Sequence, residues 1–436
     1  MNISFTQHRL DNGLDVLIHE DHGCPIVAVN VWYHVGSKNE RPGHTGFAHL
    51  FEHLMFEGSQ HYDRGYFQPL QQAGALLNGS TNADRTNYWE VVPRNALDLA
   101  LWMESDRMGY LLPALTEAKF ENQRDVVLNE RRQNYENRPY GLAGMAIVAS
   151  LYSPDHPYHW VTIGEADDIR AARLEDVRAF FQTYYRPRNA SLALAGDVTT
   201  DEALALATEY FGGIEAGEEP PSVEYTPPPP ASQDTRLLLE DRVELPRLYI
   251  AWHSPRLFAA DDAELDLVGD VLAGGKTSRL YRTLVYEERI ATEIAASQNS
   301  REIGGFFQIV ATAAPGRTLP ELERAITQTL STLVEEGPTA LEMERGQAQA
   351  EASFVYRLQT VGGFGGKSDQ LNTYNTYLGN PGFFDADLAR YRRVTSQGLQ
   401  SAARQWLAPG SRVLLSVVPK GRVALALSES IPVAVS

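Results

Sequence analysis

The sequence predicts an α+β protein made of two homologous halves. The chain has 436 residues, more than one ordinary hydrophobic core accommodates, so two to three domains are expected. Segment 213–234 contains Pro227–Pro230 and is too rich in proline to join a packed core. Strands and helices follow in the same order on its two sides, which indicates an internal duplication. We therefore expect a first domain at 1–215, a linker at 216–235 and a second, homologous domain at 236–436.

The first half is expected to begin with strands and to continue with helices. Residues 5–20 alternate in character around Asp11-Asn12-Gly13, a pattern typical of a hairpin. Residues 26–35 are almost continuously apolar, which predicts a central strand buried on both faces. The other expected elements are strands at 76–82, 86–92 and 191–195 and helices at 45–56, 64–73, 94–110, 116–135, 141–152, 174–185 and 200–211.

The second half is expected to repeat this succession. Gly362-Gly363-Phe364-Gly365-Gly366 predicts a flexible turn between helices. The expected elements are strands at 236–240, 247–253, 290–298 and 305–313, helices at 263–272, 278–286, 319–335 and 339–360, and a last helix and strand within 396–418.

Helix 45–56 carries two histidines four residues apart, His49 and His53. Positions i and i+4 lie on one face of a helix, so both imidazoles can bind one metal ion. Glu52 falls beside that face and can reach a water on the same ion. Imidazole suits zinc, and a catalytic zinc site takes three protein ligands and leaves one position for water. The alternative is a core helix that happens to carry two histidines.

A third ligand is expected from helix 116–135. Phe120, Val126 and Val127 indicate its buried side, and Glu130 faces inward with them. A buried carboxylate needs a partner, which is either zinc or a basic residue such as Arg131. The counterpart of the first metal-binding helix in the second half has no histidine, so only the first half can hold the metal. The candidates for the third ligand are Glu121, Asp125, Glu130 and Glu136, with Glu130 the leading one.

His49-x-x-Glu52-His53 followed by Glu130 resembles the inverted zinc motif of the pitrilysin/insulinase peptidases, which include the mitochondrial processing peptidase β subunit. The resemblance implies two homologous α+β domains, each a mainly antiparallel sheet with helices packed on one face. It also implies one zinc ion per chain on His49, His53 and Glu130, with Glu52 as the general base that activates the zinc-bound water. Further segments that resemble the family are 10–14, 46–58, 122–132 and 274–280.

The family binds an extended peptide along an edge strand of its catalytic domain. The polar stretch that matches this strand comprises Asn78, Gly79, Ser80 and Thr81. From the residues alone, the region 78–88 could also be an ordinary solvated strand pair.

Three positions depart from the family pattern. Gln123 stands where many relatives have a glutamate that supports the zinc site, so it brings a hydrogen-bonding group but no charge. Tyr286 and Thr292 stand where active members have an arginine and a tyrosine that contact the substrate inside a closed chamber. The chain thus resembles the zinc-binding subunit of a heterodimer, and we expect a homologous partner that supplies the Arg/Tyr pair. The alternatives are a non-catalytic assembly subunit of a larger complex and a homodimeric peptidase.

Composition excludes several other classes. A net charge of -18 argues against nucleic-acid binding, because phosphates require the opposite sign. The single cysteine excludes an internal disulfide and a cysteine-based zinc site. No apolar run is long enough to span a bilayer. Residues 1–7 have no signal-peptide character, so a cytoplasmic protein is expected, or a periplasmic one if a signal peptide has been removed.

Overall fold

The chain folds into two compact units, each assembled from three separate segments. The computed structural model describes residues 2–227, 233–410 and 412–434. The expected domain limits stay a prediction, and residues 228–232 of the expected linker lie outside the described residues. The first unit comprises 1–131, 160–224 and 353–386, and the second comprises 132–159, 225–352 and 387–436.

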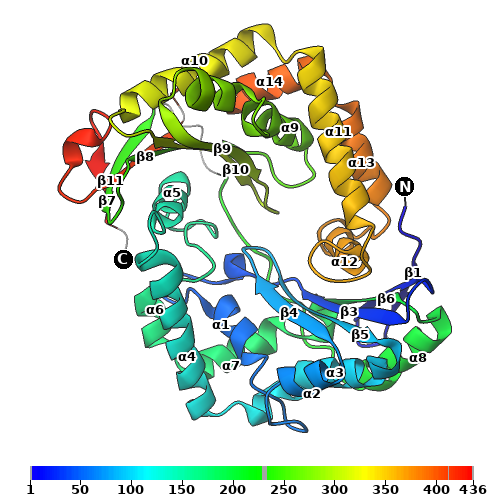
Figure 1. Ribbon diagram of the computed structural model, residues 1–436. Helices are drawn as coiled ribbons and strands as arrows, with labels where there is room; N and C mark the ends of the chain where they lie inside the picture. The colour runs from blue at the N-terminus through cyan, green and yellow to red at the C-terminus, as the bar shows by residue number, and fades with distance from the viewer. Residues whose placement is uncertain (1, 228–232, 411, 435–436) are drawn as a thin grey trace. The chain divides into compact units, whose positions relative to one another are not determined.

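The first unit is built on a six-stranded mixed sheet. Neighbouring strands in this sheet are antiparallel, except for β2 and β6, which are parallel. The hairpin and the buried central strand β3 are as expected, and the strand at one edge is β4 (Figure 1). In spatial order the strands are β1 (Thr6–Arg9), β2 (Asp15–Glu20), β6 (Ala190–Gly196), β3 (Ile26–Tyr33), β5 (Thr86–Pro93) and β4 (Leu76–Thr81).

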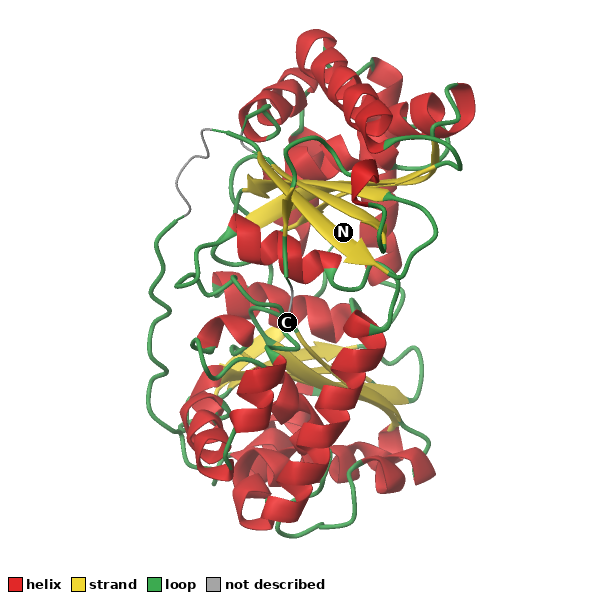
Figure 2. Cartoon of the chain, turned by 90° about the vertical axis from the view of Figure 1, so that its left-hand side faces the viewer, coloured by secondary structure: helices red, strands yellow, loops and turns green. Residues whose placement is uncertain are grey.

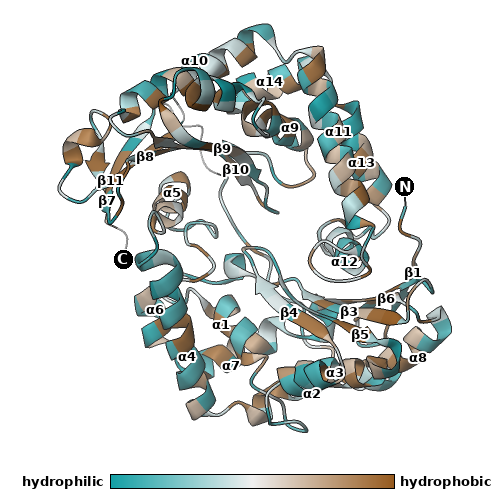
Figure 3. Ribbon diagram, in the orientation of Figure 1, coloured by the Kyte–Doolittle hydropathy of each residue, from teal (hydrophilic) through white to brown (hydrophobic). Residues whose placement is uncertain are grey.

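Helices from the first half of the chain cover one face of this sheet. Valines 27, 29 and 31 of β3 are fully buried on that face. The central strands are mostly hydrophobic, whereas β4 is brown in one part and pale in the rest (Figure 3). The helices are α1 (Phe47–Leu54), α2 (Phe67–Gln72), α3 (Leu97–Ala114), α4 (Glu117–Arg131), α6 (Ala166–Ala171), α7 (Leu174–Tyr184) and α8 (Thr200–Phe211), of which α6 was not expected from the sequence.

The second unit repeats this sheet. Its last five strands follow the same order as β2, β6, β3, β5 and β4, so two homologous sheet-and-helix domains are confirmed (Figure 2). In spatial order its strands are β12 (Ile431–Pro432), β7 (Thr235–Asp241), β11 (Val413–Pro419), β8 (Arg247–Ser254), β10 (Gly305–Ala313) and β9 (Ala291–Asn299).

The helices of the second half include two that the sequence did not predict. The segment expected as a helix at 278–286 forms π-helical turns at Tyr281–Glu287. The helices are α9 (Asp262–Ala273), α10 (Leu319–Glu336), α11 (Ala340–Arg357), α12 (Lys367–Leu378), α13 (Phe384–Arg393) and α14 (Ser396–Trp406), of which α12 and α13 were not expected. None of the helices in the described part of the chain is both long enough and apolar enough to cross a bilayer.

Each sheet also receives one helix from the other half of the sequence. Helix α5 (Ala143–Leu151) packs on β8 and β11 of the second sheet. Helix α12 packs on β3 and β6 of the first sheet, against side chains that alternate with the buried valines of β3. Both faces of each sheet therefore carry helices, and the second face is covered by a segment far away in sequence.

We expect the substitution Asp266→Asn to stabilise the second unit at alkaline pH. Asp266 of α9 accepts a hydrogen bond from the Tyr391 hydroxyl at 2.6 Å, and burial raises the pKa of this carboxyl to about 7. A folded-state pKa above the unfolded value means that stability is lost as the pH rises from about 4 to about 7. Asparagine does not titrate, so the free energy of unfolding should rise by about 4 kcal/mol near pH 8 but only by about 1.5 kcal/mol near pH 5. Thermal melts at the two pH values check this, with exposed Asp155→Asn of the second unit as the control; equal shifts at both would contradict it.

Candidate metal centre

Helix α1 presents its two histidines from a firmly packed base. Leu50, Phe51 and Leu54 are buried on the other sides of the helix. The helix begins after Gly46, which has a φ of 86° and no room for a side chain, because a Cβ there would lie 2.8 Å from the Ile163 carbonyl oxygen. These contacts fix the direction in which His49 and His53 point.

A buried carboxylate holds the first turn of α1. Glu40 accepts hydrogen bonds from the backbone N–H of Gly46 at 2.9 Å and of Ala48 at 2.8 Å. The indole N–H of Trp160 donates to the same carboxyl at 3.0 Å. Burial raises the pKa of Glu40 to about 8, although these three donors oppose the shift. Glu40 therefore satisfies donors that every helix leaves open at its N-terminus.

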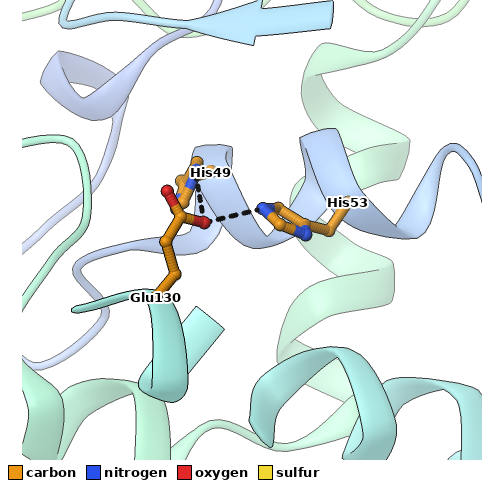
Figure 4. A group of neighbouring side chains, drawn as sticks. All are labelled: His49, His53 and Glu130. Carbon is orange, nitrogen blue, oxygen red and sulfur yellow. Dashed lines mark ion pairs between the residues drawn. The ribbon is translucent and has the colours of Figure 1, made fainter. Parts of the chain in front are cut away.

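The structure brings together the three residues expected as metal ligands. Glu130 Oε2 lies 3.6 Å from His49 Nε2 and 3.3 Å from His53 Nε2 (Figure 4). Zinc bonds to nitrogen and oxygen are about 2.0–2.2 Å, so two ligands of a tetrahedral ion are about 3.3–3.6 Å apart. Among the described residues, these three form the one group of His, Cys, Asp or Glu side chains that could hold a metal, with ligand atoms within 4.8 Å of one another. The donor set fits zinc.

Glu130 lies beside the buried stripe of α4, not within it. The stripe consists of Phe120, Gln123, Val127 and Arg131. Val126 is 39% exposed, so its expected place on the buried side was wrong. Glu130 itself is about one-third exposed, which leaves room for water and substrate beside it.

The other candidates for the third ligand point elsewhere. Glu121, Asp125 and Glu136 are exposed and do not approach the histidines closely enough to join the group. Arg131 donates to the Gly164 carbonyl oxygen at 3.2 Å, and its guanidinium lies 3.6 Å from the Glu165 carboxylate.

The two histidines have different electrostatic surroundings. Burial, and then the charge of His53, lower the pKa of His49 to about 4. Burial also lowers the pKa of His53, but its hydrogen bond to Glu130 and the charges of Glu52 and Glu130 outweigh burial, so this pKa is raised. The Nδ1 atom of His49 is buried and has no hydrogen-bond partner among the described residues.

Gln123 connects His53 to a carboxylate. It forms a hydrogen bond with His53, which favours the protonated imidazole, and its amide N–H donates to Glu57. Gln123 itself has no charge, but its hydrogen-bond partner Glu57 supplies a negative charge behind it. Sequence reasoning missed Glu57 because it follows the zinc motif and carries no spacing signal of its own.

Glu52 lies between the histidines and the edge strand. Burial raises the pKa of this carboxyl, while a hydrogen bond from Thr81 and the charges of His53 and Arg85 oppose the increase. A carboxylate with a raised pKa is a better base near neutral pH. Thr81 and Glu52 also bring the end of β4 to the metal-binding group.

Strand β4 places the expected peptide-binding residues at the edge of the first sheet. Asn78 is exposed, Ser80 and Thr81 are half-buried, and Gly79 is buried. A Cβ on Gly79 would approach the rings of Phe56 and Tyr88 to 3.1 Å, so the segment that follows α1 packs tightly against the strand. These four residues therefore lie on the edge strand whose end, Thr81, contacts Glu52.

Arg85, which the sequence analysis did not single out, supports this strand. Its Nη1 donates to the Ser80 carbonyl oxygen at 2.8 Å and to Ser80 Oγ at 2.7 Å. Tyr286 and Thr292, two of the positions that depart from the family pattern, lie in the second unit. Tyr286 is 74% exposed there, and the Thr292 hydroxyl donates to the Thr312 carbonyl oxygen at 3.4 Å.

We expect the affinity of the chain for zinc to fall as the pH is lowered from about 8 to about 5.5. Metal binding needs neutral imidazoles. The pKa of His49 is about 4, but that of His53 lies above its ordinary value of 6.5, so protons compete for His53 first. Below that pKa the affinity should drop by about tenfold per pH unit. Competition with a chromophoric chelator, corrected for the chelator's own titration, measures the slope; a flat profile would rule out His53 as a ligand.

Comparison with known proteins identifies the family. The model described as Insulinase (Peptidase family M16) matches residues 15–154, and the model described as Peptidase M16 inactive domain matches residues 171–350. The chain is 29% identical over 373 residues to the zinc protease PqqE of Helicobacter pylori, covering 85% of this chain and 82% of that protein.

Solved structures share the fold. A protease from Helicobacter pylori superposes with a TM-score of 0.89 at 24% identity, covering 96% of this chain and 100% of that one. The periplasmic protease PqqL from Escherichia coli superposes with a TM-score of 0.78 at 18% identity, covering 98% of this chain but 49% of that one. By its two matching family models and its zinc-protease relatives, the chain belongs to the pitrilysin/insulinase (M16) family of peptidases.

Proposed function

We propose that this chain is the zinc-binding subunit of an endopeptidase that hydrolyses extended peptides. The observation that carries the proposal is the convergence of His49, His53 and Glu130 with a basic carboxylate, Glu52, beside a sheet edge. A structural subunit would not need all four groups together. Zinc-protease relatives support the same chemistry.

In this proposal the protein's own residues divide the work. A zinc ion held by His49, His53 and Glu130 would acidify water and polarise the scissile carbonyl. Glu52 takes a proton from the attacking water and then passes it to the leaving amine. Gln123 and Glu57 orient His53 and favour electron donation from its ring.

The edge of β4 offers backbone groups to an extended peptide. Asn82 N–H donates to the Arg85 carbonyl oxygen at 3.0 Å and closes the β4–β5 hairpin. Along an antiparallel pair, the backbone N–H and C=O groups of successive residues point alternately toward the partner strand and away from it. The N–H and C=O of Ser80 therefore point toward β5, whereas those of Gly79 and Thr81 point to the open edge. The Gly79 N–H is covered by the Asn78 side-chain oxygen at 2.8 Å, as expected for a group with no strand partner. A peptide would add to this edge as a further strand.

A partner subunit completes the site in this proposal. Tyr286 and Thr292 cannot replace an arginine and a tyrosine at the same two positions, because neither supplies a cation. The structural match covers 98% of this chain but only 49% of PqqL. The rest of PqqL is therefore about as long as this chain, which is enough for a second unit. We propose a homologous subunit that brings the Arg/Tyr pair and closes a chamber around the peptide.

Peptide hydrolysis by the zinc-loaded chain, with and without a homologous partner, tests the proposal. We expect turnover of a quenched-fluorescent peptide library only when both are present, because the transition-state contacts are divided between them. Full activity of the chain alone would mean that it is complete in itself. A chain that binds no zinc would instead favour the non-catalytic assembly subunit.

A further inference from the structure

A single carboxylate from α12 collects four hydrogen bonds on the polar face of the first sheet. Asp369 Oδ1 accepts from Trp32 Nε1 at 2.9 Å, from Asn30 Nδ2 at 3.3 Å and from Asn87 Nδ2 at 3.4 Å. Asp369 Oδ2 accepts from the Gly365 backbone N–H at 2.7 Å. Hydrogen bonds to an ionised acceptor are about twice as strong as neutral ones. Asp369 therefore ties α12 to both β3 and β5.

The same contacts continue to the edge strand. The Ser80 hydroxyl of β4 donates to Asn87 Oδ1 at 2.6 Å, on the side of Asn87 away from Asp369. Arg85 donates to Ser80, and its guanidinium lies 5.1 Å from the centre of the Trp32 ring. Trp32 donates to Asp369, so the contacts form a closed ring. We call the members of this ring the Asp369 network; they are Asp369, Asn87, Ser80, Arg85 and Trp32.

The network and the metal-binding group lie on opposite faces of β4. Successive side chains of a strand point to opposite faces. Thr81 and Gly79 face α1, since Thr81 bonds Glu52 and Gly79 touches Phe56. Ser80 faces the other way, toward Asn87. The strand proposed to bind peptide is thus held from one side by the catalytic helix and from the other by the Asp369 network.

The chain leading into α12 is shaped to reach this place. A Cβ on Gly362 would lie 2.6 Å from both Ala28 and Val91, so only glycine lets the backbone approach the sheet. Phe364 packs edge-on against Trp89, and Lys367 forms a 2.7 Å ion pair with Asp21. The glycine-rich segment is a turn between α11 and α12, as expected, and its compactness places Asp369 over the middle of the sheet.

We infer that Asp369, from the half of the chain without metal ligands, is a positioning residue for peptide binding that fixes edge strand β4 through Asn87 and Ser80. This inference rests on the proposed function only in treating β4 as the peptide-binding strand. The mechanical part, that Asp369 restrains β4, depends on the contacts alone. Loss of the carboxylate should loosen the strand and weaken peptide binding without touching the metal-binding group.

The first experiment is hydrogen exchange of the full chain, loaded with zinc, for Asp369→Asn and for the control Asp385→Asn. Asp385 is exposed and lies near α12 in sequence, so its variant makes the same charge change without touching the network. We expect amide exchange in residues 76–81 to accelerate about tenfold in Asp369→Asn, as one lost charge-assisted bond predicts. Zinc affinity and exchange in α4 should not change. Exchange in 76–81 equal to that of the control would overturn the inference.

A milder variant keeps the test decisive if Asp369→Asn does not fold. Trp32→Phe removes one donor to Asp369 and keeps an aromatic ring beneath Arg85. We expect about threefold faster exchange in residues 76–81 from this variant. Ser80→Ala should accelerate the same amides, and combining it with Trp32→Phe should add less than the sum of the two, because both cut one network. Full additivity would contradict the ring of contacts.

The kinetic readout uses the peptide that the active, assembled wild-type enzyme cleaves fastest. Asp369→Asn should raise KM about tenfold and lower kcat by a smaller factor, because β4 binds the peptide and reaches Glu52 only through Thr81. A fall in kcat with unchanged KM would overturn the positioning role. If the assembled wild-type enzyme cleaves nothing, the proposed function fails, and hydrogen exchange still decides whether Asp369 restrains β4.

Discussion

Replacing Glu52 with glutamine is expected to abolish peptide hydrolysis by the assembled enzyme while zinc stays bound. Glutamine keeps the size of the side chain and can still accept the hydrogen bond from Thr81, but it cannot take a proton from water. General-base catalysis by a positioned carboxylate contributes on the order of 10² to 10⁴ in rate, so turnover should fall by about that factor. Zinc content by atomic emission and initial rates with a quenched-fluorescent peptide measure the two properties separately.

The matched control for this substitution is Glu209→Gln on α8. Glu209 is exposed and lies in the same unit. Its substitution makes the same chemical change away from the metal-binding group. The control should keep both zinc and activity. Wild-type turnover in Glu52→Gln would refute Glu52 as the base, and loss of zinc would show that the residue supports the metal instead.

The pH profile of the wild-type enzyme bears on the same residue. Burial raises the pKa of Glu52 in the metal-free chain, and only the ionised carboxylate can act as a base. The rate should therefore fall on the acidic side as the Glu52 carboxylate becomes protonated. A bound cation would move this limb toward lower pH, because it favours the charged carboxylate.

Local patterns were enough to predict the elements that carry the site. The turn at Asp11-Asn12-Gly13, the apolar run of β3 and the i, i+4 pair His49 and His53 each act over a few residues. The same is true of β4, whose polar character is typical of an edge. Where the physics is local, the sequence alone was informative.

Long-range contacts could not be predicted in this way. Helices α5 and α12 each cover the sheet of the other half, and no periodicity in a segment says on which distant sheet it will pack. Val126 has the same hydropathy as Val127 but is exposed, because the buried stripe of α4 follows Phe120, Gln123 and Val127 at helical spacing. The reach of Asp369 to Asn87 spans 282 positions and left no signal at either end.

The candidate site likewise contains residues that the sequence predicts and supporting contacts that it does not predict. The two histidines follow from helix geometry, whereas the choice of Glu130 among four acidic residues needed the family motif as well. The contacts of Glu40 with the first turn of α1, and of Gln123 with Glu57, depend on how separate segments meet. They orient the ligands, and a sequence pattern that marks ligands does not mark what holds the ligands in place.

Replacing Glu130 with glutamine is expected to remove zinc binding. The amide keeps the shape of the side chain but has no charge to neutralise a divalent cation, and one of its two terminal atoms is a donor. Changes to groups that only support metal ligands cost about 10- to 100-fold in affinity, so loss of a ligand should exceed about 100-fold. Hydrolysis should be lost with the metal. Glu121→Gln, the same change on an exposed position of α4, is the control and should bind zinc normally.

The same variant separates a metal centre from a simple ion-pair cluster. Glu130 lies within 3.6 Å of both imidazoles, and its charge is one cause of the raised pKa of His53. Glu130→Gln should therefore lower the pKa of His53 in the metal-free chain, which NMR titration of the imidazole can follow. If the pKa falls but zinc affinity stays as in the wild type, Glu130 only pairs with the histidines, and the third ligand must come from another residue. If both fall, the carboxylate that pairs with His53 is also the one that holds the metal.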